Sequence, residues 1–149
     1  MRRRVFIVSM FVAGLSLRAE AAARLTNFRF GIWRIASDGI FDLVEETKRI
    51  PFRLKSTGFR FGVGFDNPDR APIEWYEIMH LPTATKKVTG NLHSEAKDVL
   101  RTKTMSSSQP SIVDDFWFDQ GDPLGNHSLE LFVNNALVYR VEFVVVGDS

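Results

Sequence analysis

Residues 129–145 read LELFVNNALVYRVEFVV and have the pattern of two β-strands joined by a tight turn. Apolar side chains fall at every second position of each arm, which is typical of a strand with one buried face. Asn134 and Asn135 separate the arms, and asparagine tolerates the left-handed backbone that a short hairpin turn needs. We therefore predict a β-hairpin whose inward residues are Leu129, Leu131, Val133, Leu137, Tyr139, Val141, Phe143 and Val145.

A second strand is predicted at residues 58–65, GFRFGVGF. Its apolar positions (Phe59, Phe61, Val63 and Phe65) share one face, and three of the four residues on the other face are glycine. Glycine weakens a strand unless another group must approach it closely. We expect a large ring, such as that of a tryptophan, to pack over the glycines, and a ligand groove is the alternative.

Further strands are predicted on both sides of these two. Residues 25–36 alternate through Ile32 and then change parity at Trp33, which indicates a bulge or bend, and Ser37-Asp38-Gly39 forms a turn. Residues 40–50 fit a strand better than a helix, although both spacings are present. Residues 72–81 carry Ile73, Trp75, Met79 and Leu81 on one parity and end at Pro82.

These segments predict an all-β chain, an antiparallel immunoglobulin-like β-sandwich of about six to eight strands. A chain of 149 residues with thirteen Phe and three Trp can form one packed domain, here residues 24–149. Residues 83–111 contain no aromatic side chain and are predicted to form a polar surface excursion. Within it, Leu92, Ala96, Val99 and Leu100 fit a short helix, whereas Val99, Arg101, Lys103 and Met105 fit an edge strand.

The first 23 residues have the layout of a secretory signal peptide. Arg2, Arg3 and Arg4 precede an uncharged stretch from Val5 to Leu17, and small residues suited to a signal peptidase follow at 19–23. The uncharged stretch is shorter than the roughly 20 residues that span a bilayer. We expect cleavage, no membrane span afterwards and a periplasmic or secreted location; a buried N-terminal helix or an uncleaved anchor is the alternative.

Cleavage also changes the charge of the chain. The leader holds four arginines and one glutamate, so the formal net charge falls from +1 to −2, with 15 basic and 17 acidic residues left. A nucleic-acid-binding protein usually retains a basic surface, so we expect no nucleic-acid partner. The chain has no cysteine, which excludes disulfides and thiolate metal sites.

Aromatic, glycine and proline landmarks carry a resemblance to a known family. In chain order these are Gly31-Ile32-Trp33, Ile50-Pro51-Phe52-Arg53-Leu54, Phe59-Arg60-Phe61-Gly62, Leu81-Pro82, Gly125-x-x-Ser-Leu-x-Leu and Phe143-Val144-Val145. Over residues 28–146 the chain resembles the bacterial family known as domain of unknown function 3859. It departs from the family at His127, where an aromatic residue is usual. The resemblance implies a small immunoglobulin-like sandwich and brings no activity, cofactor or catalytic residue.

Sequence motifs for catalysis or nucleotide binding are absent. The chain has no GxGxxG, P-loop, GxSxG or HExxH pattern. His80, His93 and His127 are scattered and lack the spacing of a zinc site, so we expect surface or packing roles for them. Two adjacent acidic pairs, Glu45-Glu46 and Asp114-Asp115, would face opposite sides of a strand and cannot act together on a glycoside. We predict no enzymatic activity and no cofactor.

One acidic cluster is a candidate metal site. Asp114, Asp115, Asp119 and Asp122 lie within nine residues, interleaved with aromatic side chains. Oxygen ligands of this kind bind calcium where a loop curls around the ion, although the spacing differs from that of an EF-hand. Charged residues beside an aromatic strand also keep its edge soluble, which is the competing explanation.

Two classes of function fit these observations. The first is a non-catalytic interaction or structural module of the cell envelope that binds another protein or a second copy of itself, with residues 83–111 and the end loops as contacts. The alternative is a carbohydrate-binding module or a small hydrolase. It requires Trp33, Trp75 or Trp117 to stand exposed beside acidic residues.

Overall fold

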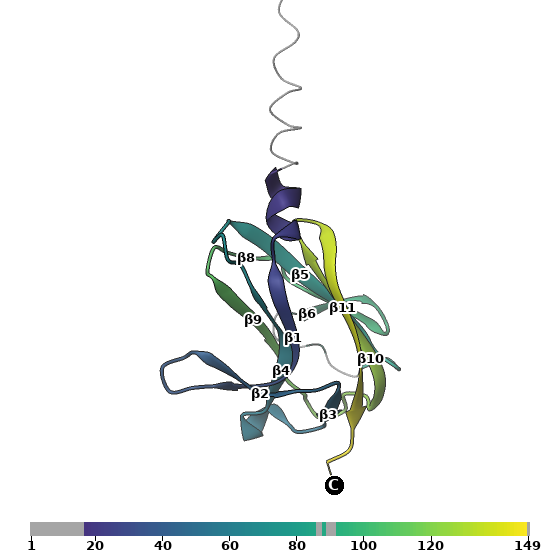
Figure 1. The fold of residues 1–149 in the computed structure, drawn as a ribbon. Helices are drawn as coiled ribbons and strands as arrows, with labels where there is room; N and C mark the ends of the chain where they lie inside the picture. Colours follow the sequence, from purple (N-terminus) through teal and green to yellow (C-terminus); the bar gives the residue numbers. More distant parts are fainter. Residues whose placement is uncertain (1–16, 86–87, 89–91, 149) are drawn as a thin grey trace, which may run out of the picture.

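The computed structural model describes residues 17–85, 88 and 92–148, and in them two β-sheets pack face to face (Figure 1). The first sheet has the order β2 (Phe41–Glu46), β1 (Thr26–Ile35), β4 (Arg60–Asp66), β9 (Ser111–Phe116). The second has the order β3 (Arg49–Pro51), β11 (Ala136–Val146), β10 (Gly125–Val133), β5 (Ile73–His80), β7 (Val99–Thr102), β6 (Leu92–Ala96), and β8 (Met105–Ser107) also pairs with β5. A short 3₁₀ helix, η1 (Lys55–Thr57), precedes β4.

This architecture confirms the predicted β-sandwich. The named strands pair antiparallel except β3, which lies parallel to β11. The described residues form eleven strands, more than the six to eight predicted. The additional strands are short: residues 40–51 divide into β2 and β3, and the segment 83–111 contributes three more.

The core lies between the sheets and consists mainly of aromatic and β-branched side chains. Phe61, Val63 and Phe65 of β4 are almost fully buried, as their alternation predicted. On the opposite sheet, the inward residues of the β10–β11 hairpin are buried as predicted except near its turn. Asn134 and Asn135 both have positive φ, as the predicted turn requires.

The prediction was wrong for Leu137, which is 52% exposed. The pairing of β10 with β11 shifts between Leu131 and Phe132, so that Leu131 pairs with Tyr139 and Phe132 pairs with Leu137. One extra residue, Val138, lies between them on β11. Because a bulge of this kind moves each residue beyond it to the other face, Leu137 turns outward.

The glycines of β4 receive a tryptophan, as expected. Trp33 is buried over the outer face of the first sheet, and its Nε1 donates a 3.1 Å hydrogen bond to the Gly62 carbonyl. A Cβ at Gly64 would lie 2.6 Å from the indole ring. Trp33 reaches this face by alternation, because β1 pairs with β4 without interruption from Phe30 to Trp33. The β1–β2 register shifts between Ile32 and Trp33, at the predicted position of the bulge, with the extra residue on β2.

The segment 83–111 forms sheet rather than helix over much of its described length. β6, β7 and β8 extend the second sheet beyond β5. The helical alternative for residues 92–100 is therefore wrong. The strand alternative is correct for Val99–Thr102, but β7 lies between β5 and β6 rather than at the edge, and its inward residues are Leu100 and Thr102. Lys103, on the predicted face, is exposed.

Residues 17–23 form a short helix that lies against the top of the sandwich (Figure 1). Ala22 is buried there, and the Asn134 amide donates to the Arg18 carbonyl oxygen at 2.8 Å. Most of the predicted leader, residues 1–16, lies outside the described residues. Within the described part, no helix is long and apolar enough to cross a membrane.

Candidate functional site

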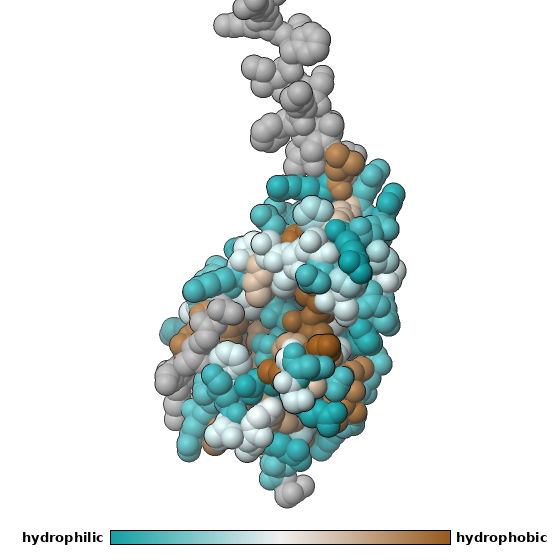
Figure 2. Space-filling view, turned by 90° about the vertical axis from the view of Figure 1, so that its left-hand side faces the viewer, coloured by the Kyte–Doolittle hydropathy of each residue, from teal (hydrophilic) through white to brown (hydrophobic). Residues whose placement is uncertain are grey.

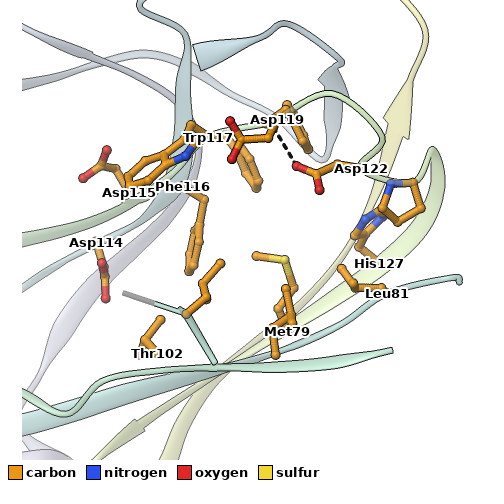
Figure 3. Close-up of a pocket in the computed structure, with 15 residues that line it drawn as sticks. Met79, Leu81, Thr102, Asp114, Asp115, Phe116, Trp117, Asp119, Asp122 and His127 are labelled. Carbon is orange, nitrogen blue, oxygen red and sulfur yellow. Dashed lines mark hydrogen bonds between the residues drawn. The ribbon is translucent and has the colours of Figure 1, made fainter. Parts of the chain in front are cut away.

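A pocket opens between the two sheets on the side where the first sheet ends at β9. The empty space in and around it, with open solvent counted, is about 720 Å³. Phe116 and Met79 point into it from opposite sheets, and Figure 3 shows Asp114 and Thr102 at one end with Asp122 and His127 at the other. The remaining wall residues are mostly apolar: Phe61, Leu81, Leu92, Leu100, Phe118 and Pro123.

Asp114, which lines this pocket, is one of a pair of carboxyl groups. Glu77 of β5 and Asp114 of β9 face each other across the sandwich, and Glu77 is 1% exposed. Burial, and then the nearby Asp114 charge, raise the pKa of Glu77 well above its ordinary value. Burial also raises the pKa of Asp114, while hydrogen bonds with Glu77 and Trp75 act in the opposite direction.

Hydrogen bonds join this pair to its neighbours and to each other. The Trp75 Nε1 donates to Asp114 Oδ2 at 3.0 Å, and the backbone N–H of Glu77 donates to Thr102 Oγ1 at 2.8 Å. The carboxyl group of Glu77 is fully buried and shares a side-chain hydrogen bond with Asp114. Because a buried carboxylate is costly, burial favours the protonated form of Glu77.

Asp115 lies on the other face of β9, as the strand alternation predicted. Its carboxylate pairs with Arg60 at 3.2 Å, on the outer surface of the first sheet. Burial raises the pKa of Asp115, and the Arg60 charge partly offsets this. Trp117 lies on the same surface, with Lys55 Nζ 4.1 Å from its ring centroid and Arg60 at 5.6 Å.

The other end of the pocket is organised by Asp122 and His127. The backbone N–H of Asp119 donates to Asp122 Oδ2 at 2.7 Å (Figure 3). Thr85 Oγ1 donates to Asp122 Oδ1 at 2.8 Å. His127 stacks on Phe143 with a centroid distance of 5.2 Å, and its Nδ1 lies 2.9 Å from the Gly125 carbonyl oxygen. Burial lowers the pKa of His127, so the ring is neutral at pH 7 with the proton on Nδ1.

The four aspartates of the calcium hypothesis are thus engaged separately. Asp114 faces Glu77 and Trp75, Asp115 pairs with Arg60, and Asp122 caps the turn at Asp119. In the part of the chain that the structure describes, no group of three or more acidic or histidine side chains is arranged to hold a metal ion. The four aspartates are close in sequence, but in the described structure they do not form one set of metal ligands.

The histidines and tryptophans occupy different environments. His80 lies 3.5 Å from Glu130 and His93 lies 3.0 Å from Glu95, both on exposed positions far from His127 in sequence. Trp33 and Trp75 are 3% and 7% exposed, and Trp117 is half-buried under two cations. No tryptophan stands exposed beside acidic residues in the described structure.

Glu77 is the site residue that sequence analysis missed. It lies between Trp75 and Met79 on the inward parity of β5, so the alternation already placed a carboxyl group in the core. A charged residue on a core face is a signal for a partner or a shifted pKa. Its partner, Asp114, comes from the opposite sheet, and strand alternation alone does not pair residues across two sheets.

Comparison with solved structures supports the fold alone. An immunoglobulin-like protein from Pseudomonas aeruginosa aligns with 85% of this chain and 99% of its own, at 17% identity and a TM-score of 0.54. An alkylpurine DNA glycosylase from Pseudomonas fluorescens, bound to DNA containing an abasic-site analogue, covers 79% of this chain and 30% of its own. Its identity is 12% and its TM-score is 0.35, which is too low to indicate a shared fold.

Sequence comparison gives a family without an activity. No curated protein matches the chain. The model of a β-sandwich domain family matches residues 28–146, from near the start of β1 to the end of β11. That range includes both sheets and every residue of the pocket described above. The chain belongs to the PM0630 beta sandwich domain family.

Proposed function

We propose that the protein is a non-catalytic interaction module of the cell envelope that binds an extended segment of a partner protein along β9. The observation that carries this proposal is the position of the pocket directly beside an unpaired edge. β9 ends the first sheet, and among the described strands only β4 pairs with it. Every second residue of β9 therefore turns its backbone N–H and C=O toward the open side of the sandwich.

A segment added to β9 would use the pocket for specificity. Strand addition satisfies the free backbone groups, and pockets that receive alternate side chains select the sequence. Asp114 and Phe116 of β9 line the pocket, and Leu100 and Thr102 of β7 form the opposite wall. The side chains of an added strand that point between the sheets would lie over this pocket.

The other exposed edge of the first sheet is less suited to pairing. The β1–β2 hairpin projects toward the viewer in Figure 2, on a face where hydrophobic residues gather among hydrophilic ones. The hairpin exposes Ile35, Ile40 and Val44. However, β2 carries the bulge opposite Ile32 and three acidic side chains. Bulges and charges are the features that keep an edge strand from pairing.

The tryptophans favour protein binding over carbohydrate binding. A sugar platform needs an exposed aromatic face beside polar groups, and Trp33 and Trp75 are buried in the fold. The half-buried Trp117 lies against Lys55 and Arg60, and the nearby Asp115 is paired with Arg60. The pocket also lacks a nucleophile with a neighbouring base among its described residues, which supports a non-catalytic role.

The location and the finer family assignment belong to the same proposal. The basic, apolar and small-residue segments of residues 1–23 support export to the periplasm or beyond. The landmarks shared with the domain-of-unknown-function 3859 family support membership there and add no activity. A partner met in the envelope, including a second copy of this chain, is consistent with both.

Site-specific photo-cross-linking in cells tests this function. Ser111 and Val113 lie two residues apart on β9, so a photoreactive residue placed at each samples the same edge. We expect both positions to capture one partner, at sites in that partner two residues apart, as strand pairing requires. Glu142, exposed on β11, is the control position. Equal capture of the same partner from Glu142, or irregular spacing of the captured sites, would overturn the proposal.

Deleting residues 83–111 is not a usable test of this surface. The deletion removes β6, β7 and β8 and the buried Leu100, so the second sheet loses its outer strands. Loss of a partner after that deletion would report unfolding rather than loss of a contact.

A further inference from the structure

We propose that the pocket between the sheets binds a primary ammonium group carried on an apolar stem, with Asp114 as the carboxylate that recognises it. This inference rests on the proposed function, because a lysine side chain of the bound segment has that chemistry. It assigns the pocket a ligand class, and it is tested below by small amines that need no strand pairing.

The shape of the pocket separates apolar walls from a carboxylate end. Met79, Leu100 and Phe116 form walls between the sheets, and Asp114 stands at the inner end beside Thr102 (Figure 3). Methylene groups lose contact with water in such a space, while a charged head would be costly there without a partner. A stem of several methylenes ending in a cation fits both parts.

The inner end of the pocket has a carboxylate acceptor. Asp114 lines the pocket, and its Oδ2 accepts the Trp75 indole N–H. An ammonium group has three donors and no acceptor, so it satisfies acceptors without leaving a group of its own unpaired. Glu77 is fully buried and shares a hydrogen bond with Asp114, so Asp114 is the carboxyl group of the pair that the pocket presents to a ligand.

The charges around this end also favour a cation. The groups that act on Asp114 are Glu77, Trp75 and Asp115, and none of them is positive. Arg60 lies on the far side of β9, where it pairs with Asp115. A bound ammonium would therefore be the counter-ion of the Glu77–Asp114 pair, and an organic cation suits the site because the described residues offer no three-ligand metal set.

Titration with n-hexylamine, followed by NMR of the ¹⁵N-labelled protein, tests the assignment directly. We expect saturable shifts at Thr102, Asp114 and Phe116, and no such saturation with 1-hexanol, which has the same stem and no charge. Asp114→Asn should weaken amine binding about tenfold or more, as expected for loss of one charge-assisted hydrogen bond. Asp148→Asn removes an exposed carboxylate that pairs with Arg53, and should leave binding unchanged.

Two results would overturn the inference. Equal binding of hexanol and hexylamine to the native protein would show an apolar pocket without charge recognition, and this comparison needs no variant. Unchanged amine binding by a folded Asp114→Asn protein would place the ammonium elsewhere. If Asp114→Asn does not fold, the comparison of hexylamine with hexanol on the native protein decides the assignment.

The two proposals fail in distinguishable ways. A partner segment that still cross-links to Ser111 and Val113 after its lysines are replaced by methionine leaves strand addition standing and removes the ammonium assignment. Amine binding at Asp114 without any cross-link from β9 removes the proposed function and leaves the pocket with its ligand class.

Discussion

The indole of Trp33 lies across Gly64, with two ring carbons 2.6 Å from the place where a Cβ would sit. The same ring donates its N–H to the Gly62 carbonyl at 3.1 Å, so two glycines of β4 form the floor on which it packs. Arg29 lies over the ring with its guanidinium carbon 5.7 Å from the centroid. These contacts bury an aromatic side chain on the outer face of a sheet, where it would otherwise be exposed to solvent.

Gly64→Ala should therefore destabilise the protein by about 1–3 kcal/mol, the usual cost of forcing an extra methyl group into a packed site. The free energy of unfolding from urea denaturation measures the effect. Gly147→Ala is the control, because a Cβ there meets nothing within 4 Å. In the background of Trp33→Phe, which shortens the ring system, the same alanine should cost less. Equal costs in both backgrounds would show that the indole is not what limits Gly64.

Leu100→Ala should cost about 2–5 kcal/mol, the range for truncating a buried leucine. Leu100 is 6% exposed on β7, inside the segment that composition marks as a polar excursion. Leu137→Ala is the matched control. Alternation predicts that Leu137 is buried, but the bulge turns it outward. We therefore expect its truncation to change the free energy of unfolding by no more than about 0.5 kcal/mol. Denaturation curves that rank the two variants in the opposite order would contradict both assignments.

These two leucines show where sequence analysis of the fold succeeds and fails. Period-two alternation identified the inward faces of β4 and β10 because each strand there is long and regular. One extra residue at Val138 reverses the parity of Leu137, and the alternation beyond it gives no sign of the bulge. β7 has only four residues, too few for alternation to separate a strand from a helix.

The candidate site was predictable only in part. The sequence placed Asp114 and Asp115 on opposite faces of one strand, which agrees with their contacts to Trp75 and Arg60. The alternation of apolar residues in the sequence also places Glu77 on the inward side of its strand. What it lacked was the packing of β5 against β9, strands of different sheets, which brings Glu77 and Asp114 together. Neighbouring aspartates in sequence suggested a calcium loop, and nothing in the sequence indicated that Asp114 shares a side-chain hydrogen bond with Glu77 of the other sheet.

His127→Phe should flatten the dependence of stability on pH below neutrality. Burial lowers the pKa of His127 from its ordinary 6.5, so the unfolded chain takes up the proton first as the pH falls. The contribution of His127 to the free energy of unfolding is present above pH 6.5. It is lost as the pH falls from 6.5 to the lowered pKa. Phenylalanine keeps the stack on Phe143 and loses the hydrogen bond to Gly125, worth about 0.5–1.5 kcal/mol.

Thermal denaturation of both proteins between pH 5 and 7.5 measures the change in slope. His93→Gln removes an exposed histidine and controls for loss of an imidazole as such. A slope that changes equally in the two variants would contradict a special role for the buried ring.

Glu77→Gln should stabilise the protein at neutral and alkaline pH, and the gain should shrink in acid. Burial and the neighbouring Asp114 raise the pKa of Glu77 above its ordinary 4.5, so the folded protein holds this proton more tightly than the unfolded chain. The contribution of Glu77 to stability is therefore greatest below pH 4.5 and is lost as the pH rises toward the raised pKa.

Glutamine stays neutral at every pH, and its amide can donate to Asp114, which removes this loss. We expect a gain of about 1–3 kcal/mol at pH 8, the usual desolvation cost of a buried polar group, and a smaller difference at pH 4. Urea denaturation from pH 4 to 8 measures both, with the exposed Glu142→Gln as the control. Parallel stability curves for Glu77→Gln and the native protein would mean that Glu77 and Asp114 do not share a proton between the sheets. If the curves converge in acid as expected, the buried pair is charged only at a cost, and a cation bound beside Asp114 would be the natural means of offsetting it.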